Sequence, residues 1–260
     1  MVANFSPAPT GAQRGKPSLL THDEVLTLFH EFGHGLHHLL TKVNVGDVAG
    51  VNGVEWDAVE LPSQFMENWA WHPEGIALIS RHVDTGETLP ERMLQSMLAA
   101  KNFQSGMQTL RQLEFALFDL LIHAKNPAPD YPQLLALLDS VRADLSIMPT
   151  ASYNRFANGF SHIFAGGYAA GYYSYKWAEL LSADAFSKFE ETSIFDKNAG
   201  RSFRDNILAK GGSQSAKANF EAFRGREARI DALLRHSGFL TSSYDELLSD
   251  DTDNANTQAW

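Results

Sequence analysis

Two histidines and a glutamate near the start of the chain have the types and the spacing of a hydrolytic metal site. The residues His30-Glu31-Phe32-Gly33-His34 read H-E-x-x-H within an apolar-periodic run. On a helix, which turns about 100° per residue, His30 and His34 lie on one face about one turn apart, so both imidazoles can bind a single ion. Glu31 is turned away from the ion and toward its bound water. The motif therefore predicts that His30 and His34 bind zinc and that Glu31 is the general base for water attack on a carbonyl group.

A catalytic zinc needs a third protein ligand, and three residues could supply it. His37 shares the helical face, but a third ligand from one straight helix would crowd the ion along a line. Glu55 falls in a glycine-rich loop, whereas Glu60 falls on a second helical pattern, where a carboxylate is held more firmly. We favour Glu60, whose structural alternative is to pair with Asp57 in a capping box. Glu67 and Asp57 could orient the ligand imidazoles through their other ring nitrogen.

A second stretch carries hydroxyl groups that fit the same chemistry. Tyr168, Tyr172 and Tyr175 recur at i, i+4 and i+7 just after Gly166 and Gly167, so on a helix they would form one face of phenols. Alone, such a stripe more often indicates core packing. Beside a zinc site, phenol donors suit the negative charge that hydrolysis builds on the carbonyl oxygen, and we predict that role for them.

The element that must position the histidines is a helix that starts at Thr21. Residues 21–24 spell a capping box, and the apolar positions that follow step by three and four to about Lys42. The apolar positions that we expect to face the core are Val25, Phe29, Phe32, Leu36 and Leu39. Gly33 and Gly35 lie inside this helix at a cost of about 1 kcal/mol each relative to alanine, which predicts a closely packed neighbour or a substrate backbone beside them.

The rest of the chain is mostly helical by pattern. A glycine-rich loop over 43–56 is followed by a second helix start at 57–60, with Pro62 in its first turn. Further helical runs are expected at 74–83, 90–125, 131–146, 167–190, 202–210 and 215–236. We therefore predict a mainly α, multihelical catalytic domain with at most a small β element near the zinc helix.

The length and the amino-acid composition indicate a globular protein. At 260 residues, of which 44% are hydrophobic and 11% aromatic, the chain has enough apolar side chain for a packed core. We expect an extended lead-in over 1–20, a catalytic domain over 21–240 and an acidic, disordered tail over 241–260. The acidic residues of the tail are Asp245, Glu246, Asp250, Asp251 and Asp253.

Charge and cysteine content exclude several classes of partner and site. The formal net charge is −10, with 31 acidic and 21 basic residues and no Lys/Arg cluster, which argues against nucleic acid and anionic membranes as partners. The chain has no cysteine, so a metal must be held by histidine and carboxylate. We find no signal-peptide or transmembrane run, and we expect a soluble, cytoplasmic protein.

Four sequence motifs together resemble one family of zinc metallopeptidases, that of thimet oligopeptidase, neurolysin and oligopeptidase A. They are most similar to the bacterial oligopeptidase A type. The motifs are Leu20-Thr21-His22-Asp23-Glu24-Val25, His30-Glu31-Phe32-Gly33-His34, Glu60-Leu61-Pro62-Ser63-Gln64-Phe65-Met66-Glu67-Asn68-Trp69, and His162 through Tyr175. The resemblance covers most of residues 1–240. It implies a zincin-like catalytic domain that hydrolyses short peptides with one Zn²⁺ per chain.

The resemblance also implies roles for individual residues. The residues implied for metal binding are His30, His34 and Glu60, and the implied base is Glu31. The residues implied for stabilising the transition state or binding substrate are Tyr168, Tyr172, Tyr175 and His162.

Members of that family are several hundred residues longer at the N-terminus, where the additional residues form much of one wall of a deep substrate channel. This chain resembles their C-terminal catalytic portion alone. We therefore expect a zinc endopeptidase or, as the alternative, a truncated zinc- and peptide-binding fragment with little or no turnover, because an absent wall positions substrate poorly. A helical interaction module with incidental histidines would bind no stoichiometric zinc. Apolar surface that the N-terminal portion normally covers would favour self-association.

Overall fold

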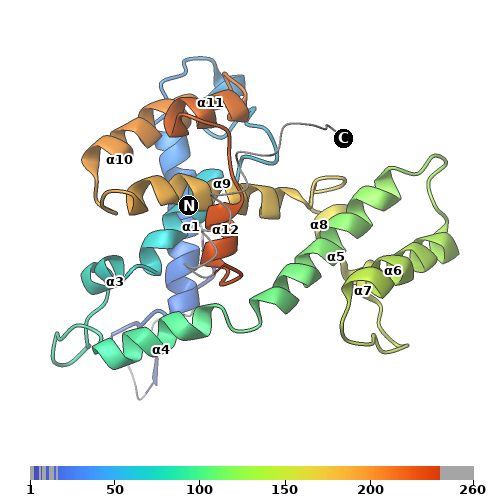
Figure 1. The fold of residues 1–260 in the computed structure, drawn as a ribbon, viewed down its shortest axis with the longest axis horizontal. Coiled ribbons are helices and arrows are strands. Elements are labelled where there is room, and N and C mark those ends of the chain that lie inside the picture. Colours follow the sequence, from blue (N-terminus) through green and yellow to red (C-terminus); the bar gives the residue numbers. More distant parts are fainter. Residues whose placement is uncertain (1–2, 6, 8–9, 12–14, 16, 241–260) are drawn as a thin grey trace, which may run out of the picture.

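The computed structural model describes residues 3–5, 7, 10–11, 15 and 17–240, and Figure 1 shows the course of the chain. Its α-helices are α1 (His22–Leu39), α2 (Leu61–Glu67), α3 (Pro73–Ile79), α4 (Glu91–Lys101), α5 (Ser105–His123), α6 (Tyr131–Leu145), α7 (Phe156–Gly159), α8 (Ser161–Phe164), α9 (Ser174–Glu190), α10 (Lys197–Phe203), α11 (Ala216–Arg224) and α12 (Asp231–His236). Two 3₁₀ turns, η2 (Gly46–Val48) and η3 (Asn68–Ala70), and a π-helical segment, η4 (Arg204–Leu208), complete the elements. No strand occurs among the described residues, which confirms the mainly α prediction. The tail predicted for 241–260 lies outside the described residues.

Helix α1 starts where its sequence predicts. Thr21 is the N-cap: its hydroxyl accepts the backbone N–H of Glu24 at 3.2 Å, and the Glu24 carboxylate accepts the backbone N–H of Thr21 at 2.8 Å. This reciprocal pair satisfies two donors at the start of the helix that would otherwise be unbonded. The helix ends at Leu39, close to the predicted Lys42.

The buried face of α1 differs from the predicted one. The sequence pattern places Phe32 and Leu39 in the core, and this is wrong: they are 44% and 73% exposed, whereas Gly33 is buried. The reason is the close approach of α2, since a Cβ on Gly33 would lie 2.4 Å from the carbonyl oxygen of Pro62. Gly33 therefore serves helix packing, while Gly35 has no such neighbour within 4 Å in the described part of the chain.

Helix α2 begins later than the sequence pattern indicates. The pattern starts at Asp57, but the first helical residue is Leu61, followed by Pro62. Proline is tolerated in the first turn, where its missing N–H costs nothing, and it disrupts any later turn. Glu60 is therefore the N-cap residue, and its side chain makes no cap hydrogen bond. The alternative capping box with Asp57 does not form, because Asp57 accepts the hydroxyl of Tyr173 at 2.8 Å.

Three predicted helical runs are each divided. The run over 90–125 breaks between α4 and α5, where Gln104 adopts a left-handed conformation with φ 56°. The run over 215–236 breaks after α11, at Gly225 with φ 80°. The run over 202–210 covers the end of α10 and the π-helical η4. None of the described helices is both long and apolar enough to span a membrane.

Two apolar cores support the chain. The first lies between α1, α2, α9, α10, η4 and α11, and it includes Phe65, whose ring stacks on Phe203 at 4.0 Å. The second lies between α5, α6, α7 and α8 and includes Phe118 and Leu138. In Figure 1 the pair α5 and α6 extends away from the group formed by α1, α10 and α11, and α9 runs from one group to the other. Residues on α9 and just before it therefore join the two cores.

The predicted helix over 167–190 begins only at Ser174. Residues 165–173, which we call the tyrosine segment, form turns instead. Gly167 at φ 83° and Ala170 at φ 57° adopt left-handed conformations that a right-handed helix cannot contain. The predicted helical face of phenols is therefore wrong, and only the last of its three tyrosines lies on a helix.

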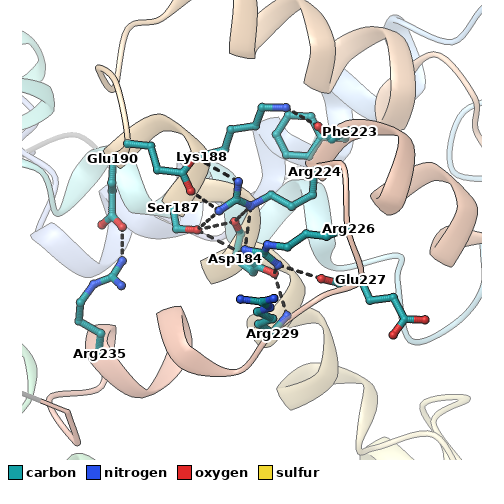
Figure 2. A network of polar contacts seen from close by, with 11 residues as sticks. Asp184, Ser187, Lys188, Glu190, Phe223, Arg224, Arg226, Glu227, Arg229 and Arg235 are labelled. Atoms are coloured by element: carbon teal, nitrogen blue, oxygen red, sulfur yellow. Dashed lines mark hydrogen bonds and ion pairs between the residues drawn. The ribbon is translucent and has the colours of Figure 1, made fainter. Parts of the chain in front are cut away.

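A cluster of charged side chains joins α9 to the segment between α11 and α12, as Figure 2 shows. Asp184, whose side chain is 1% exposed, accepts hydrogen bonds from Nε of Arg224 at 3.1 Å and from Nη2 of Arg226 at 2.6 Å. The backbone N–H of Arg229 donates to it at 2.8 Å. Burial raises the pKa of Asp184, but these hydrogen bonds and the Arg226 charge outweigh burial and lower it. We call these four residues the arginine cluster.

Candidate metal centre

His30 and His34 of α1 meet Glu60 at the start of α2. Nε2 of His30 lies 3.2 Å and Nε2 of His34 lies 3.1 Å from Oε2 of Glu60. One ligand atom from each of the three residues lies within 4.8 Å of the others. The two imidazoles are partly buried and the carboxylate is buried. We call these three residues the triad.

The separations within the triad fit a zinc ion. Zinc binds imidazole nitrogen at about 2.0–2.1 Å and carboxylate oxygen at about 2.0–2.2 Å in a tetrahedral arrangement, so two ligand atoms of one ion lie about 3.3–3.5 Å apart. The distances of 3.1 and 3.2 Å between ring nitrogens and carboxylate oxygen approach this spacing. Two histidines and one carboxylate also leave a fourth position for water.

The hydrogen bonding of His30 gives a second reason for a cation at this place. Nδ1 of His30 lies 2.7 Å from Oε1 of Glu67 and can donate to it. A neutral imidazole that donates from Nδ1 carries a lone pair on Nε2, and that nitrogen faces Oε2 of Glu60. Two lone pairs at this distance repel each other unless a proton or a metal ion lies between them. Glu67 thus orients the imidazole as a partner of a metal-binding histidine does.

The carboxylates of Glu60 and Glu67 bring negative charge to the imidazoles of the triad. Burial raises the pKa of Glu60, but hydrogen bonds from His30, His34 and Ser63 outweigh burial and hold the pKa well below its usual range. Burial lowers the pKa of His30, yet hydrogen bonds and charges from Glu60 and Glu67 raise it to about 9. The hydroxyl of Ser63 donates to Oε2 of Glu60 at 3.0 Å and helps to hold the carboxylate in place.

The other two ligand candidates lie outside the triad. Oε2 of Glu55 accepts the backbone N–H of Ala216 at 3.0 Å, at the start of α11. His37 is buried, and burial together with the charges of His34 and His38 lowers its pKa to about 4. Neither ring nitrogen of His37 has a hydrogen-bond partner among the residues that the structure describes. The geometry therefore favours Glu60 among the three alternatives.

Glu31 follows His30 on α1 and is partly buried. Its carboxylate has no hydrogen bond or ion pair within the described part of the chain. Since nothing else occupies it, this carboxylate is available to accept a proton from a group bound beside the triad.

Two of the predicted tyrosines lie beside the triad, and the third turns away from it. The hydroxyl of Tyr168 donates to Oε1 of Glu60 at 3.2 Å. The ring of Tyr168 stacks on that of Tyr175, with the centroids 4.9 Å apart. The hydroxyl of Tyr172 instead donates to Oε1 of Gln112 on α5 at 3.0 Å.

The tyrosine hydroxyls remain protonated near neutral pH. Burial raises the pKa of Tyr168, and hydrogen bonding with Tyr175 and the charge of Glu60 raise it further. Burial also raises the pKa values of Tyr172 and Tyr175. His162 on α8 is exposed, and its ring centroid lies 5.7–6.2 Å from those of the three tyrosines. The structure thus brings all four residues together, although it does so without the predicted helix.

The sequence patterns did not indicate Trp56, an aromatic side chain beside the triad. Its ring centroid lies 4.9 Å from that of Tyr168, and a Cβ on Gly171 would lie 2.8 Å from its Cδ1. The available signal was an aromatic residue near the end of the glycine-rich loop, shortly before Glu60. Periodicity could not rank it, because a loop has no repeating face.

A cleft of about 950 Å³ adjoins the triad. Its lining includes Gln64 and Glu67 of α2, Gln108 and Gln112 of α5, and Lys176 of α9. None of the three triad residues lines this cleft; Glu67, whose carboxylate lies 2.7 Å from Nδ1 of His30, is the residue that connects the cleft to the triad. The polar lining offers donors and acceptors to a ligand rich in amide groups.

Comparisons with known proteins give a consistent picture. The model of peptidase family M3 matches residues 1–239. Oligopeptidase A of Escherichia coli (strain K12) is 57% identical over 224 residues, which are 86% of this chain and 33% of that protein. Oligopeptidase A of Haemophilus influenzae is 56% identical over 240 residues (92% of this chain, 35% of that protein), and saccharolysin of Saccharomyces cerevisiae is 37% identical over 243 residues (92% and 33%). The chain therefore spans about a third of the length of these relatives.

Proposed function

The chain belongs to peptidase family M3, and from this premise we propose that it is a zinc-dependent oligopeptidase that hydrolyses short peptides. The observation that carries the proposal is the convergence of His30, His34 and Glu60, from two helices, at distances that suit one zinc ion. The relatives named oligopeptidase A support peptide hydrolysis by a metallopeptidase.

We assign metal binding to the triad. A zinc ion there would polarise a water molecule, lowering its pKa to about 7, and would act as a Lewis acid toward a carbonyl oxygen. Glu67 holds the ring of His30 so that Nε2 points into the site. Ser63 and Tyr168 donate to the two oxygens of Glu60 and fix the plane of its carboxylate. Such supporting hydrogen bonds keep the ligands in place before the ion binds.

We assign the role of general base to Glu31. Its unengaged carboxylate would take the proton of the attacking water and then deliver it to the nitrogen of the leaving amine. General acid–base catalysis of this kind contributes about 10²–10⁴ to the rate.

We assign stabilisation of the developing negative charge to Tyr175 and to Tyr168, whose hydroxyl would turn from Oε1 of Glu60 to the carbonyl oxygen of a bound peptide. One such donor is worth about 10²–10³ in kcat. The hydroxyl of Tyr172 is bound to Gln112, so Tyr172 contributes by holding the segment on α5. His162, which is exposed next to the three rings, is assigned to substrate binding.

The substrate class is proposed from the relatives named oligopeptidase A, and the cleft next to Glu67 is compatible with it. A cleft of about 950 Å³ accommodates a few residues of an extended peptide, and side-chain amides such as those of Gln64, Gln108 and Gln112 can bond a peptide backbone. The proposed substrates are therefore short, unstructured peptides.

The experiment that tests the function compares the wild-type chain with Glu31→Gln. The wild type should bind one zinc per chain and cleave a quenched peptide in a reaction that a chelator abolishes and zinc restores. Glu31→Gln should retain the zinc and lose about 10²–10⁴ in turnover. The matched control is Glu55→Gln, which alters a nearby carboxylate outside the triad and should keep both properties. Full turnover by Glu31→Gln with zinc bound would contradict the mechanism.

A second candidate function is a zinc- and peptide-binding fragment with little turnover. The observation in its favour is that the chain spans about a third of the length of its relatives, so a wall of the substrate site could be contributed by residues absent here. In that case the wild type would bind one zinc and a peptide without chelator-sensitive hydrolysis. The same assay therefore separates the two functions. A chain with no stoichiometric zinc would contradict both.

A further inference from the structure

The tyrosine segment, residues 165–173, relies on another helix to hold its backbone. It has no helical hydrogen-bond ladder, and its internal bonds include the one from the Gly171 N–H to the carbonyl oxygen of Tyr168 at 2.8 Å. The N–H groups of Ala170 and Tyr172 bond to a side chain of α5 instead. The path of the segment is therefore set partly from outside.

That side chain is Asp119, which is 0% exposed. Oδ1 of Asp119 accepts the N–H of Ala170 and Oδ2 accepts the N–H of Tyr172, both at 2.9 Å. Nδ1 of His123, one turn further along α5, lies 2.8 Å from the backbone carbonyl oxygen of Asp119 and 2.9 Å from its Oδ1. Hydrogen bonds to an ionised acceptor are short and directional. The two bonds from the N–H groups of Ala170 and Tyr172 therefore fix both the position and the direction of the backbone.

The conformation of Ala170 shows why such a hold is needed. Its φ of 57° is left-handed, a region that residues with a Cβ rarely adopt. Strained backbone of this kind persists only where the surroundings over-determine it. The hydrogen bond from the Ala170 N–H to Asp119 is such a constraint, applied to the strained residue itself.

The same carboxylate also serves the start of α9. The N-cap residue Tyr173 gives this helix no side-chain cap, and the Tyr172 N–H that Asp119 binds lies just before the first turn. A negative charge is favourable at this end of a helix. Asp119 therefore links the tyrosine segment to the helix that carries Tyr175.

We propose that Asp119 is a positioning residue for peptide hydrolysis. By binding the N–H groups of Ala170 and Tyr172, it holds the tyrosine segment so that the hydroxyl of Tyr168 reaches Glu60. Asp119 acts through the backbone and has no contact with the triad. Its effect on rate rests on the proposed function, whereas its hold on the backbone does not.

A second buried carboxylate on α5 supplies a matched control. Glu114 is 2% exposed and pairs with Arg111 and Arg142, both at 2.9 Å. It has no hydrogen bond to the tyrosine segment among the described residues. Glu114→Gln therefore perturbs the same helix and the same core without releasing the backbone of the segment.

The test compares Asp119→Asn and Glu114→Gln with the wild type. Asparagine has the shape of aspartate, but its NH₂ group cannot accept a hydrogen bond, so one of the two backbone bonds is lost. In Asp119→Asn, exchange of the amide that loses its acceptor, Ala170 or Tyr172, should accelerate about tenfold or more. Its kcat should fall at least tenfold with KM nearly unchanged, while the bound zinc stays at one per chain. Glu114→Gln should leave the exchange of these amides unchanged.

Three results would overturn the proposal. The first is fast exchange at Ala170 and Tyr172 in the wild type itself, a measurement that does not depend on whether a variant folds. The second is lost protection in Asp119→Asn with kcat unchanged. The third is an equal acceleration of the exchange of these amides in Asp119→Asn and Glu114→Gln, which would mark general destabilisation. If the wild type has no turnover, the proposed function fails. Unchanged amide protection in Asp119→Asn would still show that Asp119 does not hold the backbone of the tyrosine segment.

Discussion

Two buried carboxylates in this molecule are surrounded by basic side chains, yet they belong to different kinds of site. Asp184 in the arginine cluster accepts hydrogen bonds from Arg224 and Arg226, whose guanidinium groups stay charged at any physiological pH (Figure 2). Glu60 in the triad faces two imidazoles, which are positively charged only when protonated. The two carboxylates thus differ in whether their partners can give up a proton.

The difference distinguishes a structural cluster from the site that we propose for a metal ion. A guanidinium group has no lone pair for a metal, and the arginines already supply more positive charge than Asp184 needs, so the arginine cluster requires no added cation. An imidazole binds metal only in its neutral form, and that form leaves the charge of Glu60 without a cation. The kind of partner, more than the burial of the carboxylate, therefore indicates which site takes an ion. Four predictions test this distinction.

The largest effect is expected for Glu60→Gln. A neutral amide removes one zinc ligand and the charge that attracts the ion, so zinc affinity should fall by more than the 10–100-fold typical of supporting residues. Turnover of a quenched peptide should fall to background. Metal analysis after dialysis, together with the peptide assay, measures both quantities. A zinc-loaded, active Glu60→Gln protein would rule out Glu60 as a ligand.

The next effect is expected for Asp184→Asn, and it concerns stability. Removing Asp184 leaves Arg226 without its carboxylate partner and Arg224 with Glu191 alone, which should lower the free energy of unfolding by about 3–5 kcal/mol. Urea denaturation followed by circular dichroism measures the change, and the zinc content should stay at one per chain. The control Asp205→Asn removes an exposed ion pair and should leave the free energy nearly unchanged. Loss of zinc in Asp184→Asn would break the distinction between the two carboxylates.

A smaller effect is expected for Glu67→Gln. The amide oxygen still accepts the hydrogen bond from Nδ1 of His30, but it carries no charge, so zinc affinity should fall about 10–100-fold while full loading remains possible at high zinc. Competition with a coloured chelator measures the affinity. An affinity equal to that of the wild type would show that Glu67 does not support the ligand.

The smallest effect is expected in acid. The pKa of Asp184 is lower in the folded protein than in the unfolded chain, where it is about 3.9. Its contribution to stability is therefore complete above that value and is lost as pH falls through the folded pKa. The difference in free energy of unfolding between the wild type and Asp184→Asn should be constant from pH 7 to about 5 and should shrink below about pH 4. A difference that does not depend on pH would show that the charge of Asp184 contributes nothing.

Local patterns in the sequence located most of the candidate site. The capping box at Thr21 predicted the start of α1, and H-E-x-x-H placed His30 and His34 one turn apart, because both patterns depend only on neighbours along one helix. Glu60 was favoured as the third ligand because it falls on a helical pattern. That pattern begins at Asp57, several residues before the observed start of α2 at Leu61. The preference agrees with the geometry because Pro62 still has to lie in the first turn of that helix.

Other features depended on contacts that no local pattern contains. The apolar stripe of α1 placed Phe32 in the core, whereas the close approach of α2 at Gly33 decides which face is buried. The spacing of three tyrosines suggested one helix, whereas Ala170 is left-handed and Asp119 holds its N–H from α5. Hydrophobic periodicity cannot detect either effect, because each arises between segments distant in the chain.

By itself, the sequence determined the types of the reactive groups, the helix that presents two of them and the mainly α class of the fold. Those properties follow from side-chain chemistry and from spacing within one or two helical turns. The tertiary structure alone decided that Tyr168 lies against Glu60, 108 residues away, and that Asp119 holds Tyr172 across 53 residues. It also decided that Asp184 meets arginines while Glu60 meets imidazoles, and this difference of surroundings is why we propose a metal at Glu60 and a structural role for Asp184.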